Sequence, residues 1–254
     1  MRISADLGWL LVTALIALRF GAALALTPIL AFGSLPPTFR VLLVFALAAL
    51  LGAAAGIQGV APVDAAGFAA MAATEALLGA LLGFGILAAF AAFQLGGRLL
   101  DLQLGFGVAT LIDPATRGHA PLLGTLLWMT GVVVFFAIDG HLVLVRALAL
   151  SLQTVPPGTP LDGLQPLIAV GQFGAMFTFA LALVAPVVFV LLLVDTVVAV
   201  MARTMPQMNV FILSLPLKIL VGLLTLALSV VHLGPVAQRC FESLFDMWES
   251  VLVR

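Results

Sequence analysis

The fold class of this chain is decided by residues 167–200, which read LIAVGQFGAMFTFALALVAPVVFVLLLVDTVVAV. Asp195 is the only charged side chain in this stretch. An α-helix needs about 20 mainly apolar residues to cross the hydrocarbon core of a bilayer. The stretch is long enough for that, and Pro186 within it predicts a helix that is tilted, kinked or split in two.

Other parts of the chain have the same apolar character, namely residues 9–32, 41–60, 66–93, 122–138 and 210–233. In lipid, backbone N–H and C=O groups must be bonded within the protein, which leaves helices and closed barrels. Barrel strands alternate between apolar and polar residues, whereas these runs are unbroken. We predict an all-α, multi-pass integral membrane protein of about six long apolar helices, arranged as hairpins. Residues 1–254 are expected to form a single membrane-embedded domain.

The composition supports a membrane location. Of the 254 residues, 64% are hydrophobic and 8% are charged, and the mean hydropathy is +1.31. Soluble domains are about half apolar and about a quarter charged. A net charge of −1 gives no electrostatic basis for binding nucleic acid. The single cysteine, Cys240, excludes an intrachain disulfide and a multi-cysteine metal site.

Residues 94–121 form the longest stretch that is not continuously apolar. Helix-breaking residues are frequent in it: Gly96, Gly97, Gly105, Gly107, Pro114 and Gly118. We therefore expect this connector not to form one straight helix.

The C-terminal residues 239–254 have a different pattern. Apolar side chains recur at three- and four-residue steps, at Phe241, Leu244, Phe245, Trp248, Val251 and Leu252. This spacing predicts an amphipathic helix. Its polar face carries Glu242, Asp246 and Glu249, which anionic lipid would repel. Either a partner protein or the chain's own helices should cover the apolar face.

Charged residues inside the apolar segments are informative. Arg19, Glu75 and Asp195 each interrupt such a segment, and a charge near the centre of a membrane helix costs about 2.5–3.5 kcal/mol on insertion scales. Each is expected to face protein or a water-filled cavity, although for Arg19 snorkelling to the interface is an equal alternative. The glycine pairs 52/56 and 79/83 predict close approach of helix backbones.

Motifs of catalysis are not found. The sequence has neither a GxxxxGK[ST] phosphate loop nor an HExxH zinc motif. Asp139 and Asp195 are candidates for the aspartyl pair of an intramembrane protease, but Asp139 is expected at a helix end. Neither Ser151 nor Ser214 has a GxSxG frame. We expect no enzymatic activity, no cofactor and no metal; the histidines lack ligand spacing, at His119, His141 and His232.

Several motifs resemble those of one known family. They are LGFGVATLIDP at 104–114, DGHL at 139–142 followed by Ser151 and Pro156–Gly158, RTMPQMNVF at 203–211 and SLPLK at 214–218. The turn from Pro36 to Arg40 and the series Glu75, Gly79, Gly83 also fit. The chain is similar, over nearly its whole length, to the FliR/SctT family of type III secretion export-gate subunits.

The resemblance implies a non-enzymatic subunit of the flagellar type III protein export gate. Such a subunit would lie in the bacterial inner membrane, in the flagellar basal body, surrounded by membrane lipid. Its implied partners are FliP-like and FliQ-like gate subunits, FlhB-like and FlhA-like export components, and the unfolded flagellar proteins that pass through the conduit. The alternatives are an SctT-type subunit of an injectisome and a small-solute membrane transporter.

The resemblance also implies which residues act. A pore plug maps to residues 105–121, with Gly105, Phe106, Gly107, Leu111, Ile112, Asp113 and Pro114 as its candidates. Its glycines would supply backbone freedom and its apolar side chains a seal; a static connector covered by protein is the alternative. Candidate contacts to other subunits are Glu75, Asp195, Arg203, Pro206, Gln207, Asn209 and Lys218. For the residues near 203–218 the alternative is an ordinary cytoplasmic turn.

Overall fold

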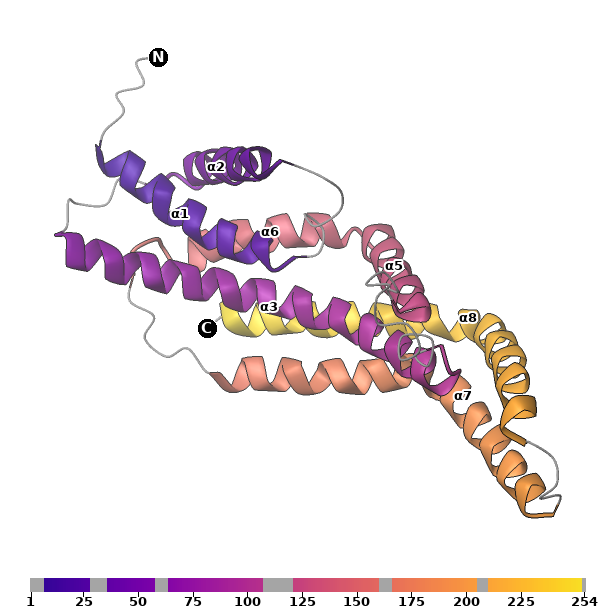
Figure 1. Ribbon diagram of the computed structural model, residues 1–254. Helices are drawn as coiled ribbons and strands as arrows, with labels where there is room; N and C mark the ends of the chain where they lie inside the picture. The colour runs from indigo at the N-terminus through magenta and orange to yellow at the C-terminus, as the bar shows by residue number, and fades with distance from the viewer. Residues whose placement is uncertain are drawn as a thin grey trace. The chain divides into compact units, whose positions relative to one another are not determined.

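A computed structural model describes residues 7–27, 36–57, 64–106, 121–159, 166–204 and 210–252. All regular secondary structure in these ranges is α-helical (Figure 1). The helices are α1 (Leu7–Ala25), α2 (Pro37–Ala54), α3 (Ala65–Gln103), α5 (Leu122–Ala137), α6 (Gly140–Thr154), α7 (Pro166–Thr204) and α8 (Val210–Leu252). The predicted all-α class is confirmed.

The multi-pass prediction is confirmed as well. Within the described ranges, five helices are long and apolar enough to cross a membrane, or six if α5 and α6 form one bent span. The break between α5 and α6 lies at Asp139, whose φ of 56° is in the left-handed region. Asp139 therefore lies at a helix end, as its position beside Gly140 predicts.

Residues 94–121 do not form one straight helix, as expected, because α3 ends at Gln103; residues 94–103 nevertheless still belong to α3. Gly96 and Gly97 lie inside this helix and permit close packing instead of ending it. A Cβ at Gly96 would lie 2.9 Å from the carbonyl oxygen of Ala180, and one at Gly97 would lie 2.5 Å from Cα of Gly124. Glycine serves here to bring backbones together.

Prolines inside the long helices do not end them: of the outcomes expected for Pro186 the split in two is excluded, and the expected boundary before the C-terminal helix is not found. α7 runs unbroken through Pro186, and α8 is continuous from Val210 to Leu252 with Pro216 and Pro235 inside it. The expected sixth span and the amphipathic C-terminal helix are thus parts of one helix. α6 was not predicted, because a 15-residue helix containing Arg146 is shorter than the apolar runs on which the spans were assigned.

The chain forms two compact units. Unit 1 comprises Met1–Ala88, Asp139–Phe173 and Ser243–Arg254, and unit 2 comprises Ala89–Ile138 and Gly174–Glu242. The expectation of a single domain over residues 1–254 stays a prediction.

In unit 1, α2 lies beside α1 (Figure 1), and the start of α3 packs closely against α1. Gly79 and Gly83 allow this approach: a Cβ at Gly79 would collide with the carbonyl oxygen of Arg19, and one at Gly83 would lie 2.5 Å from that of Ala23. The predicted role of this glycine pair is confirmed. The last turns of α8 pack here too, where the indole N–H of Trp248 donates to the carbonyl of Leu82 at 3.0 Å. The chain's own helices therefore cover the amphipathic C-terminal segment.

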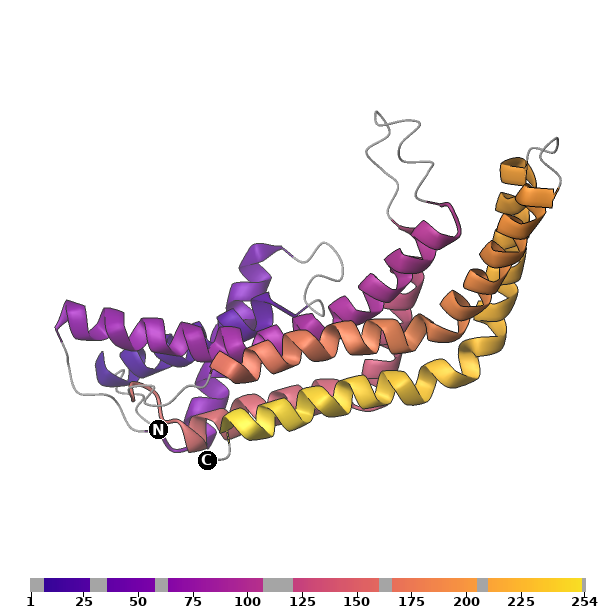
Figure 2. The same cartoon turned by 90° about the horizontal axis from the view of Figure 1, so that it is seen from below.

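In unit 2, a cluster of phenylalanines forms the core. Rings from α3, α5 and α8 meet with centroid separations of 5.3–5.7 Å, at Phe90, Phe93, Phe135 and Phe241. Three of these pairs are tilted or edge-on and one, Phe93–Phe241, is stacked. Aromatic pairs in such arrangements add about 0.5–1.5 kcal/mol each beyond the area that they bury. α7 and α8 run side by side in this unit (Figure 2).

Candidate functional site

A buried ion pair occupies the centre of unit 1. Arg19 of α1 is 0% exposed and Glu75 of α3 is 1% exposed, and Nε of Arg19 lies 2.6 Å from Oε2 of Glu75. Two charges removed from solvent attract each other strongly, but their desolvation is offset only when the remaining donors and acceptors are also bonded. The geometry around the pair meets that condition.

The remaining polar atoms of this pair bind the end of α6 and the turn that follows it. The two terminal nitrogens of Arg19 donate to the carbonyls of Ser151 at 2.6 Å and Val155 at 2.9 Å. Oε1 of Glu75 accepts from the backbone N–H of Gly158 at 3.0 Å, and the φ of +83° at Gly158 favours glycine. Three segments distant in sequence are thereby joined, and we call this arrangement the Arg19–Glu75 network.

The network decides between the two expectations for Arg19. The guanidinium does not reach toward an interface; it is buried in protein and paired, as a charge within an apolar helix requires. Both oxygens of Glu75 are bonded within the chain. A contact from Glu75 to another subunit therefore stays a prediction, and would have to be made through neighbouring residues.

A second ion pair lies in unit 2. Lys218 of α8 bonds to Oδ1 of Asp195 on α7, and the two side chains are 20% and 42% exposed. Asp195 precedes the last residue of α7 by nine positions, which is roughly 14 Å along a helix axis. The pair thus lies well inside an apolar helix, yet part of it is accessible. Lipid tails provide no hydrogen bonds to such a pair, which calls for protein or water beside it.

Large apolar side chains surround this pair on the outside of α7 and α8. Among those more than half exposed are Phe189, Leu192, Leu193, Val197, Val200, Leu220 and Leu224. Apolar surface on this scale exceeds what a soluble monomer leaves uncovered. Lipid, other protein chains or both must therefore cover it.

The two ends of the connector are held together by a residue that the sequence analysis did not single out. Asp101, near the end of α3 and 4% exposed, accepts from the backbone N–H groups of Leu123 and Gly124 at 3.0 Å each. These N–H groups belong to the first turn of α5, which lacks an N-terminal capping side chain of its own. Asp101 satisfies them and places a negative charge at the positive end of the helix dipole.

A charge at the edge of an apolar run is the signal by which Asp101 was identifiable. Arg19, Glu75 and Asp195 give a related signal, because each lies inside an apolar run. The third apolar run ends at residue 93, which places position 101 in the predicted connector, so Asp101 is not among the predicted site residues.

Leu104 and the first residues of the predicted plug, Gly105 and Phe106, follow the end of α3 in the chain. Leu104 is fully buried, and Gly222 on α8 leaves room for it, since a Cβ at that position would collide with Cδ2 of Leu104. Gly105 has a φ of +83°, and a Cβ there would lie 2.7 Å from Cδ2 of Leu215. The positive φ favours glycine at position 105, and a side chain there would also displace Leu215. Phe106 is half-buried in the same turn.

The other predicted site residues fall into two groups. Arg203 is exposed in the last turn of α7. The remaining ones lie outside the described residues, namely Gly107, Leu111, Ile112, Asp113, Pro114, Pro206, Gln207 and Asn209. Within the described ranges, no group of three His, Cys, Asp or Glu side chains is placed to hold a metal ion.

Comparison with known proteins identifies the family of this chain. The family described as Bacterial export proteins, family 1 matches residues 10–244. The chain belongs to this family. That match covers every helix described above except the first residues of α1 and the last of α8.

Relatives in this family carry names from two export systems. Flagellar biosynthetic protein FliR of Bacillus subtilis (strain 168) is 29% identical over 242 residues, covering 94% of this chain and 93% of the relative. The FliR protein of Escherichia coli (strain K12) is 29% identical over 184 residues, covering 72% and 70%. Yop proteins translocation protein T of Yersinia pestis is 27% identical over 241 residues, covering 93% and 92%. The resemblance to the FliR/SctT family is confirmed.

Proposed function

We propose that this chain is a subunit of the flagellar type III protein export gate and helps to form the conduit for unfolded flagellar proteins. The observation that carries the proposal is the family match over residues 10–244. The physical character of the chain supports it: several apolar helices carry a partly accessible ion pair and apolar faces that require cover. The role is structural, without a catalysed reaction, and the whole chain acts as one membrane-embedded domain of the inner membrane.

The partners in this proposal are FliP-like and FliQ-like subunits within the gate, with FlhB-like and FlhA-like components beside it. The chain's tagged form, solubilised from its native membrane in a mild detergent, should recover these partners in fixed ratios. Recovery of the chain alone, from cells whose export works normally, would contradict the proposal.

The ion pair provides a sharper test of assembly. If Asp195 and Lys218 lie against a neighbouring subunit, Lys218→Ala should lower the recovery of the gate partners, and Arg203→Ala should do the same. Arg146→Ala is the matched control, because Arg146 is an exposed arginine of α6 in unit 1. Undiminished recovery from both variants would favour an ordinary connection between α7 and α8 that makes no contact with a partner.

The plug is proposed at residues 105–121. Support comes from its setting: Gly105 begins it in a conformation that favours glycine, and Asp101 holds its two ends. Replacing residues 107–120 by a Gly/Ser linker of equal length, with Asp101 and Leu123 retained, should raise the ion conductance of the assembled gate. Unchanged conductance with normal assembly would indicate a static connector instead.

An SctT-type injectisome subunit is the second candidate, because the Yersinia pestis relative covers 93% of this chain. Disruption of the gene separates the two. Loss of flagella and motility supports the flagellar gate, and loss of another secreted set of proteins with normal motility supports the injectisome. Solute uptake by vesicles that contain this chain alone would instead indicate a small-solute transporter.

A further inference from the structure

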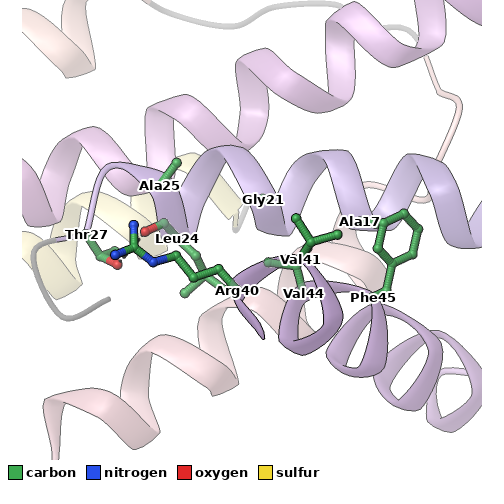
Figure 3. Close-up of a pocket in the computed structure, with 9 residues that line it drawn as sticks. All are labelled: Ala17, Gly21, Leu24, Ala25, Thr27, Arg40, Val41, Val44 and Phe45. Carbon is green, nitrogen blue, oxygen red and sulfur yellow. Dashed lines mark hydrogen bonds between the residues drawn. The ribbon is translucent and has the colours of Figure 1, made fainter. Parts of the chain in front are cut away.

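A pocket of about 390 Å³ lies between α1 and α2 in unit 1 (Figure 3). It falls within the range of about 300–1,000 Å³ that is usual for small-molecule sites. Its walls are mostly apolar, with Gly21 on α1 and Val41, Val44 and Phe45 on α2 among the lining residues. The Arg19–Glu75 network is formed by other residues, so this pocket is a separate feature of the unit.

The lining is polar at one end and apolar at the other. Figure 3 places Arg40 and Thr27 together at one end of the pocket, and Phe45 with Ala17 at the opposite end. The hydroxyl of Thr27 already donates to the carbonyl of Leu24 at 2.7 Å. The Arg40 guanidinium is therefore the group that offers donors and charge to a ligand.

The setting of Arg40 favours an anion. Arg40 is exposed in the first turn of α2, which contains no acidic residue, and the amino end of a helix carries partial positive charge. No carboxylate among the described residues forms an ion pair with it. The chain enters the 18-residue apolar helix α2 three residues earlier, so Arg40 is placed where long cationic side chains reach the headgroup level of a bilayer.

We propose that this pocket binds an anionic phospholipid, with the phosphate at Arg40 and one acyl chain along Val41, Val44 and Phe45. The arrangement of charge and apolar surface matches that of the ligand, which joins a phosphate to a hydrocarbon chain. Free phosphate would leave the apolar wall uncovered, and a zwitterionic lipid would place a second cation close to Arg40. α2 is the least covered span, with 11% of its residues buried, so lipid has access to the pocket.

Native mass spectrometry of the full chain in detergent tests the proposal with phosphatidylglycerol, phosphatidylcholine and inorganic phosphate as separate probes. We expect one phosphatidylglycerol to be retained in preference to phosphatidylcholine, and Arg40→Gln to weaken its binding about tenfold, the effect of losing one charge-assisted interaction. Arg146→Gln, which removes an exposed arginine elsewhere in unit 1, is the control and should bind as the wild type does. Equal retention of the two lipids, equal binding by the two variants, or displacement of the lipid by millimolar phosphate would overturn the proposal.

The apolar part of the pocket has its own test. A Cβ at Gly21 would meet only Cγ1 of Val44, at 3.7 Å, so Gly21→Ala is tolerated. Gly21→Leu extends further into the pocket and should abolish retention of the lipid, whereas Gly21→Ala should leave most of it. Retention unchanged in Gly21→Leu, with the variant folded by its melting temperature, would show that no acyl chain occupies the space.

A protein segment is the competing occupant. A photoreactive phenylalanine derivative in place of Phe45, irradiated in the native membrane with all gate subunits present, distinguishes the two. We expect a mass increase equal to that of a phospholipid. A cross-link to another polypeptide instead of lipid would overturn the proposal, and it would leave the proposed export function intact.

Discussion

The Arg19–Glu75 network predicts strong coupling between two residues that lie 56 positions apart. Glu75→Leu leaves the buried guanidinium without its counter-charge. Breaking a buried pair by removing one partner costs about 3–5 kcal/mol, because an uncompensated charge remains. Arg19→Leu should cost a similar amount, since it leaves the Glu75 carboxylate buried with only the N–H of Gly158 as a donor.

The double variant Arg19→Leu/Glu75→Leu should be more stable than either single variant. It contains no buried charge. Its main costs are the N–H of Gly158 and the carbonyl of Val155, which lose their side-chain partners. Each would cost about 1–3 kcal/mol if fully buried, but both positions are half-buried, so water offsets part of that cost. Two independent residues would instead give the sum of the single effects, about 6–10 kcal/mol.

The measurement is the free energy of unfolding of the purified full chain in mild detergent, from titration with a denaturing detergent. The three tryptophans supply the fluorescence signal. Glu242→Leu, which removes an exposed carboxylate of α8, is the control and should change the free energy by about 0.5 kcal/mol or less. Additive single effects, or a Glu75→Leu variant within about 1 kcal/mol of the wild type, would refute the assigned role of the network.

Three other variants, and one control, test individual contacts. Gly79→Ala should destabilise the chain by about 1–3 kcal/mol because its Cβ meets the neighbouring backbone. Gly174→Ala is the control: it has open space around it and should be neutral or stabilise the chain by up to about 1 kcal/mol. The melting temperatures of the two variants in detergent are compared. Asp101→Ala should cost about 0.5–2 kcal/mol by uncapping α5, and a melting temperature equal to that of the wild type would argue against the cap. Trp248→Phe should cost about 0.5–1.5 kcal/mol through loss of the bond to Leu82, and an unchanged stability would mean that water or lipid replaces this bond.

The sequence was sufficient to predict the class of fold because apolar length decides it. Runs such as 167–200 admit few structures in lipid other than helices. The charges at Arg19 and Glu75 were also identifiable, since each is costly in an apolar helix unless it is paired. Which charges form an ion pair depends on tertiary packing, so the sequence predicts two buried charges but not that they bind each other.

The sequence was misleading where glycine was read as a helix breaker. Gly96 and Gly97 lie inside α3, and Pro186 lies inside α7. Glycine lowers helix propensity, but in a membrane helix the loss is offset by the close packing that it permits. Proline is tolerated for a related reason, because neighbouring helices satisfy the freed backbone groups. In a membrane helix, packing therefore determines where the helix ends more than local helix propensity does, and the packing is not visible in the sequence.

The Arg19–Glu75 network has a consequence for synthesis. Arg19 is translated 56 residues before Glu75, which at about 5–20 residues per second corresponds to about 3–11 s. The carbonyl of Val155 follows Arg19 by 136 positions. The first helix therefore leaves the ribosome with a cation whose counter-charge has not yet been synthesised, and we expect Arg19 to be paired only after the third helix is inserted. The buried charge of the earliest helix is thus neutralised and hydrogen-bonded only by segments that are synthesised later.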